Sequence, residues 1–400
     1  MPNPPRHWPL LIPLLLAPVA GGAGPATAQS PQSPPDTPLV LRGGHYLDVR
    51  AGLVRPNGAI VVQGGKILAV YARGSRWNPP AGARVLDLTG RTVLPGLIDA
   101  HVHLTLAGDP DSNARVTLQA GFTTVADLGS AGGAGVRLRD AIAQGRVPGP
   151  RIIAAGSWIG AKGGICEFGG ATVGGAVEAR ARALADIEDG ADLLKVCVTG
   201  WPKDAVAFPD SVELKAEPLA AVMEVAAAAH RPVFAHAIGK AGALLAASQG
   251  VRALAHTPIV DSAGAFALKQ SGVRVISTLA SLGSRPGGEE VRRSFRLLYQ
   301  AWVPIVMGTD AGVLPHGSNA RELVALTEAG LSTADALRAA TVAAAALLDL
   351  QDVGEIRVGA AGDLVVVEGD PLRDIHVLER PVLVVKAGKE VSKAGQDLGR

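Results

Sequence analysis

Hydrophobic and polar positions follow two different rhythms along this chain. From Leu39 to about Thr92, short alternating segments such as residues 59–62 are broken by Gly and Pro, a pattern typical of β-hairpins. The same pattern returns after residue 353, for example in residues 363–367. Small sets of hairpins are hardly stable alone, so we predict that the two sets pair into one β-sandwich domain.

Between these regions, apolar strand-like runs alternate with alanine-rich helical segments. Strands are expected at residues 96–103, 123–128, 151–157, 192–198, 233–238, 253–256, 273–278 and 305–310. Helices are expected at residues 177–188, 219–230, 291–302, 321–329 and 334–348. Apolar strands joined by crossovers indicate a parallel sheet that is buried on both faces.

Eight such strands within about 250 residues predict an α/β fold with a closed (β/α)8 TIM barrel. An open, doubly wound sheet is the alternative. The glycine-rich run Gly132-Gly133-Ala134-Gly135 follows the second strand, but its spacing does not fit a dinucleotide-binding loop. We expect this run to be a flexible loop.

The first residues of the chain have the pattern of a secretion signal. Arg6 precedes an apolar stretch over residues 10–20, and Ala26-Thr27-Ala28 supplies the small residues of a cleavage site. The apolar stretch is short for a membrane span and contains two prolines. We therefore predict an exported protein, periplasmic or secreted, without stable membrane insertion; an N-terminal anchor or a disordered tail is the alternative.

These patterns divide the chain into an expected domain order. The order is a signal peptide (1–28), a linker (29–38), the first part of the β-sandwich (39–93), the barrel (94–350), the second part of the β-sandwich (351–392) and a tail (393–400). The hydrophobic fraction of 48% provides enough apolar surface for such cores.

The amino-acid composition limits the kinds of partner that the protein is expected to bind. Lys and Arg total 38 against 36 Asp and Glu, and aromatic residues make up only 4%, so neither a basic field nor a stacking surface for nucleic acid is expected. Two cysteines, Cys166 and Cys197, are few for an exported protein. A bridge between them is geometrically conceivable because both lie near strand ends, but we expect two unpaired, partly buried thiols.

Six residues of metal-binding type lie in short apolar runs near the ends of the predicted barrel strands. Lys195 occupies an apolar run, where an ammonium must be paired, neutralised or modified. Each residue alone has an ordinary structural explanation, but together they occupy the end of the barrel where active sites lie. The set predicts a two-metal hydrolase. Its members are His101, His103, Lys195, His236, His256 and Asp310.

Six motifs along the chain, three of which contain His101, His103, Lys195 and Asp310, resemble the amidohydrolase superfamily, and within it the branch of imidazolonepropionase-like proteins and Xaa-Arg or Xaa-Pro dipeptidases. The resemblance covers about residues 39 to 390 and implies a TIM barrel with a β-sandwich built from both chain ends. The motifs lie at residues 95–103, 120–125, 149–151, 190–195, 307–312 and 362–366.

The resemblance also implies a role for each residue. His101, His103 and Asp310 would bind one metal ion. His236 and His256 would bind a second, and Lys195, carboxylated by carbon dioxide to a carbamate, would bridge the two. Mixed imidazole and carboxylate ligation suits Zn²⁺, although other divalent ions could occupy such a site. A metal-bridging hydroxide would attack the carbonyl, and Asp310 would be the catalytic residue that shuttles its proton.

We therefore expect a binuclear metal-dependent amidohydrolase whose small-molecule substrate is a dipeptide or an N-acyl amino acid. Lys195 favours this function over the single-metal imidazolonepropionase and deaminase relatives. The alternatives are hydrolysis of a cyclic amide or lactone, and a non-catalytic periplasmic binding protein. A homo-oligomer is left open. Candidates for binding a substrate carboxylate are Lys162, Arg285 and His316.

Overall fold

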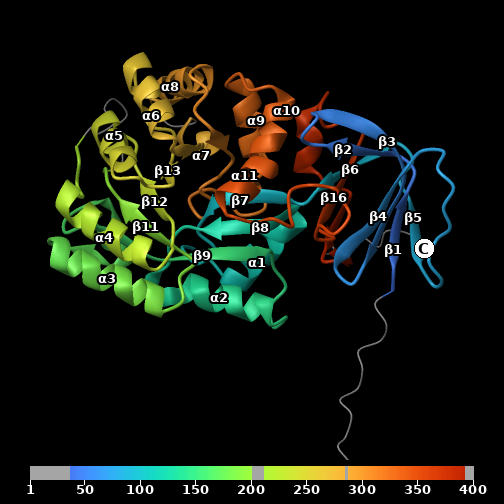
Figure 1. The fold of residues 1–400 in the computed structure, drawn as a ribbon, viewed down its shortest axis with the longest axis horizontal. Coiled ribbons are helices and arrows are strands. Elements are labelled where there is room, and N and C mark those ends of the chain that lie inside the picture. The colour runs from blue at the N-terminus through green and yellow to red at the C-terminus, as the bar shows by residue number, and fades with distance from the viewer. Residues whose placement is uncertain (1–36, 201–210, 284–286, 392–400) are drawn as a thin grey trace, which may run out of the picture. The chain divides into compact units, whose positions relative to one another are not determined.

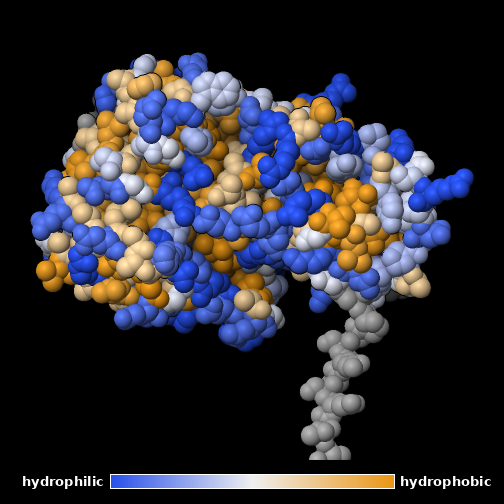
Figure 2. All heavy atoms as spheres, in the orientation of Figure 1, coloured by the Kyte–Doolittle hydropathy of each residue, from blue (hydrophilic) through white to orange (hydrophobic). Residues whose placement is uncertain are grey.

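Two β-sheets organise the chain in the computed structural model, which describes residues 37–200, 211–283 and 287–391 (Figure 1). The predicted signal peptide and the final tail lie outside the described residues. No helix in the described ranges is long and apolar enough to span a membrane. On the face drawn in Figure 2, polar and apolar residues are interspersed, with an apolar area over the sheet that is built from both ends of the described chain.

The first sheet is a nearly closed parallel barrel, as predicted, and it has a strand at each of the eight expected positions. Its strands, in spatial order, are β7 (Leu97–Val102), β8 (Phe122–Asp127), β9 (Arg151–Ala161), β11 (Leu193–Cys197), β12 (Val233–His236), β13 (Ala253–Ala255), β14 (Arg274–Ile276) and β15 (Ile305–Val306). A short ninth strand, β10 (Thr172–Val173), pairs with β9. The strands are buried along almost their whole length, so each reads as a continuous apolar run.

The segment after β15 closes the barrel against β7. Asp310 N donates a hydrogen bond to His101 O (2.8 Å), and His103 N donates to Ala311 O (2.6 Å). An isolated parallel bridge joins Val102 and Ala311. The first and last parts of the barrel therefore meet at the residues that carry the candidate chemistry.

Helices cover the outside of the barrel (Figure 1). They are α1 (Pro110–Gln119), α2 (Ala134–Ala143), α3 (Ala176–Glu188), α4 (Ala216–Ala228), α5 (Lys240–Ser248), α6 (Ser262–Ser271), α7 (Leu279–Leu282), α8 (Gly288–Gln300), α9 (Arg321–Glu328), α10 (Thr333–Ala339) and α11 (Val342–Leu347). Short 3-10 helices are η1 (Ala131–Gly133), η2 (Ile165–Gly169) and η3 (Ile375–Glu379).

Two predictions about helices were wrong. The helix expected at residues 334–348 is divided into α10 and α11, because Thr341 leaves the helical conformation (φ −137°, ψ −98°). The expected flexible loop at residues 132–135 is ordered: Gly133, at a left-handed φ of 71°, precedes α2, which begins at Ala134. The glycines there permit a tight turn into a helix and do not mark a flexible segment.

The second sheet combines both ends of the described chain. Its strands are β1 (Leu39–Arg42), β2 (His45–Asp48), β3 (Leu53–Gln63), β4 (Lys66–Ala72), β5 (Arg84–Asp87), β6 (Arg91–Pro95), β16 (Leu364–Glu368), β17 (Leu383–Lys386) and β18 (Lys389–Val391). β16 pairs antiparallel with β6, so that Val366 lies opposite Val93.

This curled sheet is continuous through hydrogen bonds, in the order β18-β17-β16-β6-β2-β3-β1-β5 with β4 paired to β3. It therefore differs from two separate facing layers. Side chains from both chain ends, including Leu41, Ile60, Val366 and Val385, nevertheless share one core. The β6 strand leads directly into β7 and thus joins this sheet to the start of the barrel.

Candidate metal centre at the barrel mouth

All six sequence-predicted residues line one cavity of about 390 Å³. They come from, or directly follow, five barrel strands, and none of the six is more than 6% exposed. The parallel strands end at the same edge of the barrel, which is why residues far apart in the sequence meet there. These residues are His101, His103, Lys195, His236, His256 and Asp310.

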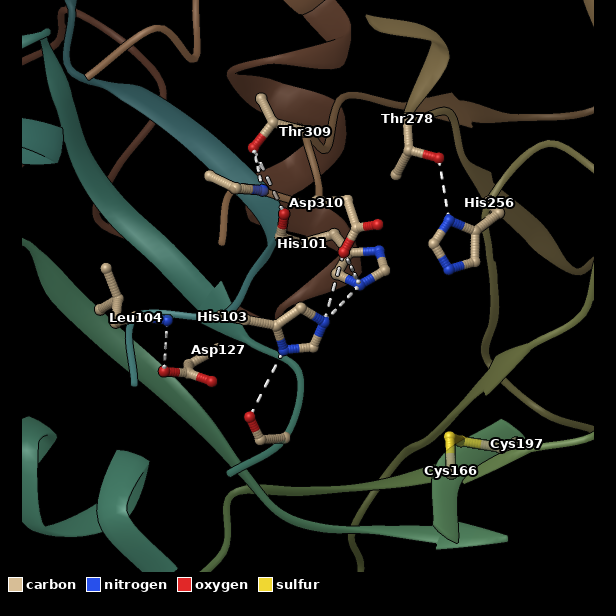
Figure 3. A network of polar contacts seen from close by, with 12 residues as sticks. His101, His103, Leu104, Asp127, Cys166, Cys197, His256, Thr278, Thr309 and Asp310 are labelled. Atoms are coloured by element: carbon tan, nitrogen blue, oxygen red, sulfur yellow. Dashed lines mark hydrogen bonds and ion pairs between the residues drawn. A yellow bond between two sulfur atoms is a disulfide. The ribbon is translucent and has the colours of Figure 1, made fainter. Parts of the chain in front are cut away.

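Three of these side chains already point at one another (Figure 3). His101 Nε2 and His103 Nε2 are 3.2 Å apart, and Asp310 Oδ1 lies 3.4 Å from the first and 3.3 Å from the second. One ligand atom from each residue lies within 4.8 Å of the others. His103 Nδ1 lies 3.4 Å from Gly129 O, which orients the ring. Two imidazoles and a carboxylate in this arrangement can hold one divalent ion.

The other two histidines lie next to this group. The His256 ring centroid is 4.9 Å from that of His101 and 4.6 Å from that of His236. His256 Nδ1 lies 3.0 Å from Thr278 Oγ1, and His236 Nε2 lies 3.4 Å from Gly200 O. The structure thus brings both rings to the cavity, and their centroids are closer to each other than those of His101 and His103, which are 5.1 Å apart.

Lys195 lies in β11, is 2% exposed, and its Nζ has no hydrogen-bond partner in the described chain. Burial lowers the pKa of its ammonium to about 7, although the charge of Asp310 opposes this shift. In a large fraction of the molecules, Lys195 therefore carries a neutral amine near neutral pH.

Burial also determines the charge of the other groups. It lowers the pKa of His236 to about 4, and the pKa values of His101 and His256 also lie well below the usual range, with Lys195 adding to each shift. Neutral imidazole is the form that binds metals. For Asp310, burial raises the pKa, but the surrounding histidines outweigh it, so its net pKa is far below normal and the carboxylate is charged.

The buried carboxylate of Asp99, which the sequence analysis did not identify as functional, supports the group of His101, His103 and Asp310. Asp99 accepts hydrogen bonds from His101 N (3.0 Å), Thr309 N (3.1 Å), Thr309 Oγ1 (2.7 Å) and Asn319 Nδ2 (2.8 Å). Burial raises its pKa to about 6 despite these donors. Asp99 therefore fixes the His101 backbone against the segment that carries Asp310. An acidic residue inside an apolar strand was the signal for it.

A second missed carboxylate, Glu322 on α9, supports the His256 side. Glu322 Oε1 accepts from Ser277 Oγ (2.5 Å) and Leu279 N (2.8 Å), and Oε2 accepts from Ala280 N (2.7 Å). These bonds hold the turn that contains Thr278, the hydrogen-bond partner of His256. Nothing in the sequence distinguished this glutamate from one on an exposed helix face.

Backbone strain accumulates at the same strand ends. His256, Thr278 and Asp310 adopt left-handed conformations, with φ of 78°, 52° and 63°. Residues other than glycine rarely adopt this conformation, and its cost is accepted mainly at functional sites. Hydrogen bonds that Asp99 and Glu322 accept hold Thr309 and Leu279, the neighbours of Asp310 and Thr278 in the chain.

The two cysteines form a disulfide, so the prediction of unpaired thiols was wrong. Parallel pairing of β11 with β9 places Cys197 opposite Gly160, and η2 folds back so that Cys166 lies over the same glycine. A Cβ at Gly160 would lie only 3.0 Å from Cys166 Cβ. The absence of a side chain there gives the bridge its space, and both cysteines line the cavity.

Two of the three candidates for binding a substrate carboxylate, Lys162 and His316, do not line the cavity. Lys162 forms an exposed ion pair with Glu178 (2.9 Å). His316 Nδ1 lies 3.3 Å from Thr117 Oγ1, and His316 is not among the residues that line the cavity. Arg285 lies outside the described residues.

A parallel barrel with histidines and a carboxylate at the carboxyl ends of its strands, joined to a sheet from both chain ends, defines a class of barrel hydrolases. Residues 92–391 match the sequence pattern of the Amidohydrolase family. The chain belongs to this family.

Individual relatives match most of this chain, and their names indicate different substrates. The ochratoxinase of Aspergillus niger is 27% identical over 417 residues, which is 85% of each chain. The imidazolonepropionase of Ruegeria sp. is 29% identical over 381 residues, covering 82% of this chain and 91% of its own. The crystal structure of a Xaa-Pro dipeptidase with bound methionine superimposes with a TM-score of 0.81 at 29% identity, covering 88% of this chain and 99% of that one.

Proposed function

We propose that this chain is a two-metal amidohydrolase that cleaves the C–N amide bond of a dipeptide or an N-acyl amino acid. The observation that carries the proposal is Lys195, a fully buried amine without a hydrogen-bond partner in the described chain, placed in one cavity with four histidines and Asp310. A single-metal site has no need of this amine.

The donor set fits two divalent cations, for which we propose Zn²⁺. His101, His103 and Asp310 would hold one ion, and His236 and His256 the other. The neutral Lys195 amine would attack carbon dioxide, forming an N–C bond and releasing a proton to solvent. The resulting carbamate is an anion with two oxygens, and it would bridge the ions in place of an uncompensated ammonium.

When bound by these residues, divalent cations would supply the Lewis acidity that lowers the pKa of a water molecule and polarises the scissile carbonyl. Asp310 would accept the proton of that water at a carboxylate oxygen and transfer it to the nitrogen of the leaving amine. The position of its Oδ1, 3.3 to 3.4 Å from Nε2 of both histidines of the first group, supports this proposal. Asp99 would keep this carboxylate in register by its bonds to the adjacent Thr309.

The test is elemental analysis of the purified protein, followed by a screen for released amine with dipeptides, N-acyl amino acids, cyclic amides and lactones. We expect about two zinc ions per chain and hydrolysis of linear amides, because the ligand set provides for both ions. Asp310→Asn should fold normally yet lose activity roughly a thousandfold or more. A protein that binds no metal would support the alternative of a binding protein, and full activity of Asp310→Asn would refute its role.

We also propose that the protein is exported, to the periplasm or beyond the cell. The signal-like pattern at residues 1–28 supports this, as does the disulfide between Cys166 and Cys197, because such bonds persist in oxidising compartments. Determination of the mature N-terminus after expression in the native host checks the proposal. An intact N-terminus on a cytosolic protein would contradict it.

A further inference from the structure

The cavity has two chemically different sides. One side carries the six residues of the candidate metal centre. The other is apolar and consists of the Cys166–Cys197 disulfide together with Leu106, Trp158, Ile165, Phe168 and Val313. The metal centre accounts for the first side, whereas the apolar side has no part in the reaction itself.

Trp158 is the fixed part of this apolar side. It lies in β9, is 4% exposed, and its ring centroid is 5.5 Å from that of His103. Two glycines leave space for the indole: a Cβ at Gly129 would lie 2.4 Å from Trp158 Nε1, and a Cβ at Gly169 would lie 2.5 Å from Cε3. The indole is therefore packed at a defined position beside the first group of ligands.

Phe168 is the exposed part of the same surface. Its ring centroid is 5.0 Å from that of Trp158, yet 63% of the residue is exposed. It lies in η2, which the disulfide ties to the end of β11, two residues beyond Lys195. An exposed phenyl ring at the mouth of a catalytic cavity gains by being covered with another apolar group.

The described residues on the apolar side of the cavity offer no charged partner to a charged substituent of a substrate. Among the described residues that line the cavity, Lys195 is the only lysine or arginine and Asp310 the only acid. Both belong to the metal centre. A charged substituent against the apolar side would be desolvated without a partner, whereas a neutral ring would gain burial.

We infer that the enzyme selects amides that carry a neutral aromatic group next to the scissile bond, with the ring packed against the surface that Trp158 and Phe168 form together. This inference rests on the proposed function and specifies its substrate class. The cavity volume of about 390 Å³ is at the lower end of the ~300–1,000 Å³ typical of small-molecule sites. It accommodates one ring and a small acyl group.

The experiment compares kcat and KM for N-acetyl-phenylalanine, N-acetyl-alanine, N-acetyl-proline, N-acetyl-lysine and N-acetyl-aspartate, with N-benzoyl-alanine to place the ring on the acyl side. We expect kcat/KM to be roughly 10- to 100-fold higher for a substrate with a ring than for N-acetyl-alanine. Equal rates, or a preference for proline or for a charged side chain, would overturn the inference.

Phe168→Ala identifies the residue responsible. It should raise KM for the ring-bearing substrate roughly tenfold, leave its kcat within about twofold, and so remove most of the preference over N-acetyl-alanine. Phe266→Ala is the matched control, because Phe266 lies in α6, is equally exposed at 62%, and does not line the cavity. An unchanged preference in Phe168→Ala would refute the assignment.

Failure of the proposed function is detected separately. If no amide is hydrolysed, calorimetric titration of the metal-containing protein with N-acetyl-phenylalanine and N-acetyl-alanine still measures selection. Tighter binding of the phenylalanine derivative that depends on Phe168 would support the aromatic site even then. Equal binding of the two would refute it.

Discussion

The Lys195 side chain is among the largest in the described chain that are almost completely withdrawn from water. A buried ammonium without a partner costs several kcal/mol. In the metal-free protein, the residue that we propose to bridge the ions therefore destabilises the fold, and lowering of its pKa to about 7 is the partial relief that burial imposes. Metal binding would make the contribution of Lys195 to the stability of the fold favourable.

Replacing Lys195 with Met should separate these two contributions. Lys195→Met has a similar shape and no charge, so the unfolding free energy of the metal-free protein should rise by about 1–4 kcal/mol. Metal binding should fall, because the proposed bridging ligand is gone. Urea unfolding in chelator measures the first effect, and elemental analysis the second.

Lys240→Met is the control, because Lys240 forms an exposed pair with Asp261 at 2.7 Å. That change should alter stability by less than about 1 kcal/mol and leave metal content unchanged. A destabilised Lys195→Met protein that keeps its full metal content would contradict the bridging role.

At this scale, the sequence predicted the residues that break an apolar pattern. The six candidates are polar groups at the ends of apolar runs, and all six reach one cavity. Glu322 could not be identified, since a glutamate on an amphipathic helix is ordinarily exposed. The disulfide was missed because it depends on the space over Gly160, which only the pairing of β9 with β11 reveals.

Two short elements at the cavity edge depend on buried contacts rather than on their own propensity. The turn after β14 is held by the three hydrogen bonds to Glu322, and η2 is held by the disulfide. Neither element is stable alone, since a single turn of helix forms too few bonds to offset its ordering. Each can be tested by removing its anchor.

Glu322→Gln should disturb the turn that positions His256. The new amide N–H would face a backbone donor, so at least one buried group loses its partner, and stability should fall by about 1–3 kcal/mol. Affinity for one of the two metal ions should fall roughly 10- to 100-fold. Titration with zinc and urea unfolding measure these effects.

The matched control for that variant is Glu328→Gln, an exposed residue on the same helix. It should change neither the zinc titration nor the unfolding free energy. Should both glutamate variants bind two ions with equal affinity, Glu322 would have no positioning role.

Removing the disulfide should lower stability without touching the metal ligands. The bond joins residues 31 apart, and the double variant Cys166→Ser, Cys197→Ser should lose about 2–4 kcal/mol of unfolding free energy. Chemical denaturation with and without reductant measures the loss. Reductant should weaken the native protein and leave the double variant unaffected; an insensitive native protein would show that the bond does not form.

Elements were predicted best where burial is complete. Fully buried strands give continuous apolar runs, and all eight barrel strands were located from them. The second sheet was anticipated as a pairing of both chain ends, but its continuity through β3, which pairs with both β1 and β2, depends on register and could not be read from short hairpins. The non-helical backbone conformation of Thr341 separates α10 from α11. The pattern of hydrophobic residues does not reveal such a conformation.

For the whole molecule, buried histidines make stability depend on pH. The pKa of His236 is lowered to about 4, and that of His256 is also lowered, whereas in the unfolded chain both titrate near 6.5. As pH falls below 6.5, the unfolded chain takes up protons that the folded chain does not bind. Stability that is fully present above pH 6.5 is therefore lost as the pH falls toward 4.

The metal-free protein should accordingly lose up to about 1.4 kcal/mol of unfolding free energy per pH unit for each such histidine. Urea unfolding in chelator between pH 7.5 and 4.5 measures this slope. His236→Gln should reduce it. His376→Gln should not, because His376 is exposed and its Nδ1 lies 3.1 Å from Glu379 Oε2, away from the buried centre. A flat profile in the native protein would contradict the burial of neutral imidazoles.

The arrangement at the junction of β7 with the segment after β15 has a consequence for how the protein is made. Asp99 and Thr309 are separated by 210 residues, and their hydrogen bonds bring His101 and Asp310 together. A polypeptide still leaving the ribosome has its first histidines long before their carboxylate partner exists. The first cation of the proposed centre could be captured only after Asp310 has been synthesised, and a chain exported unfolded, as we propose, would acquire its ions at its destination.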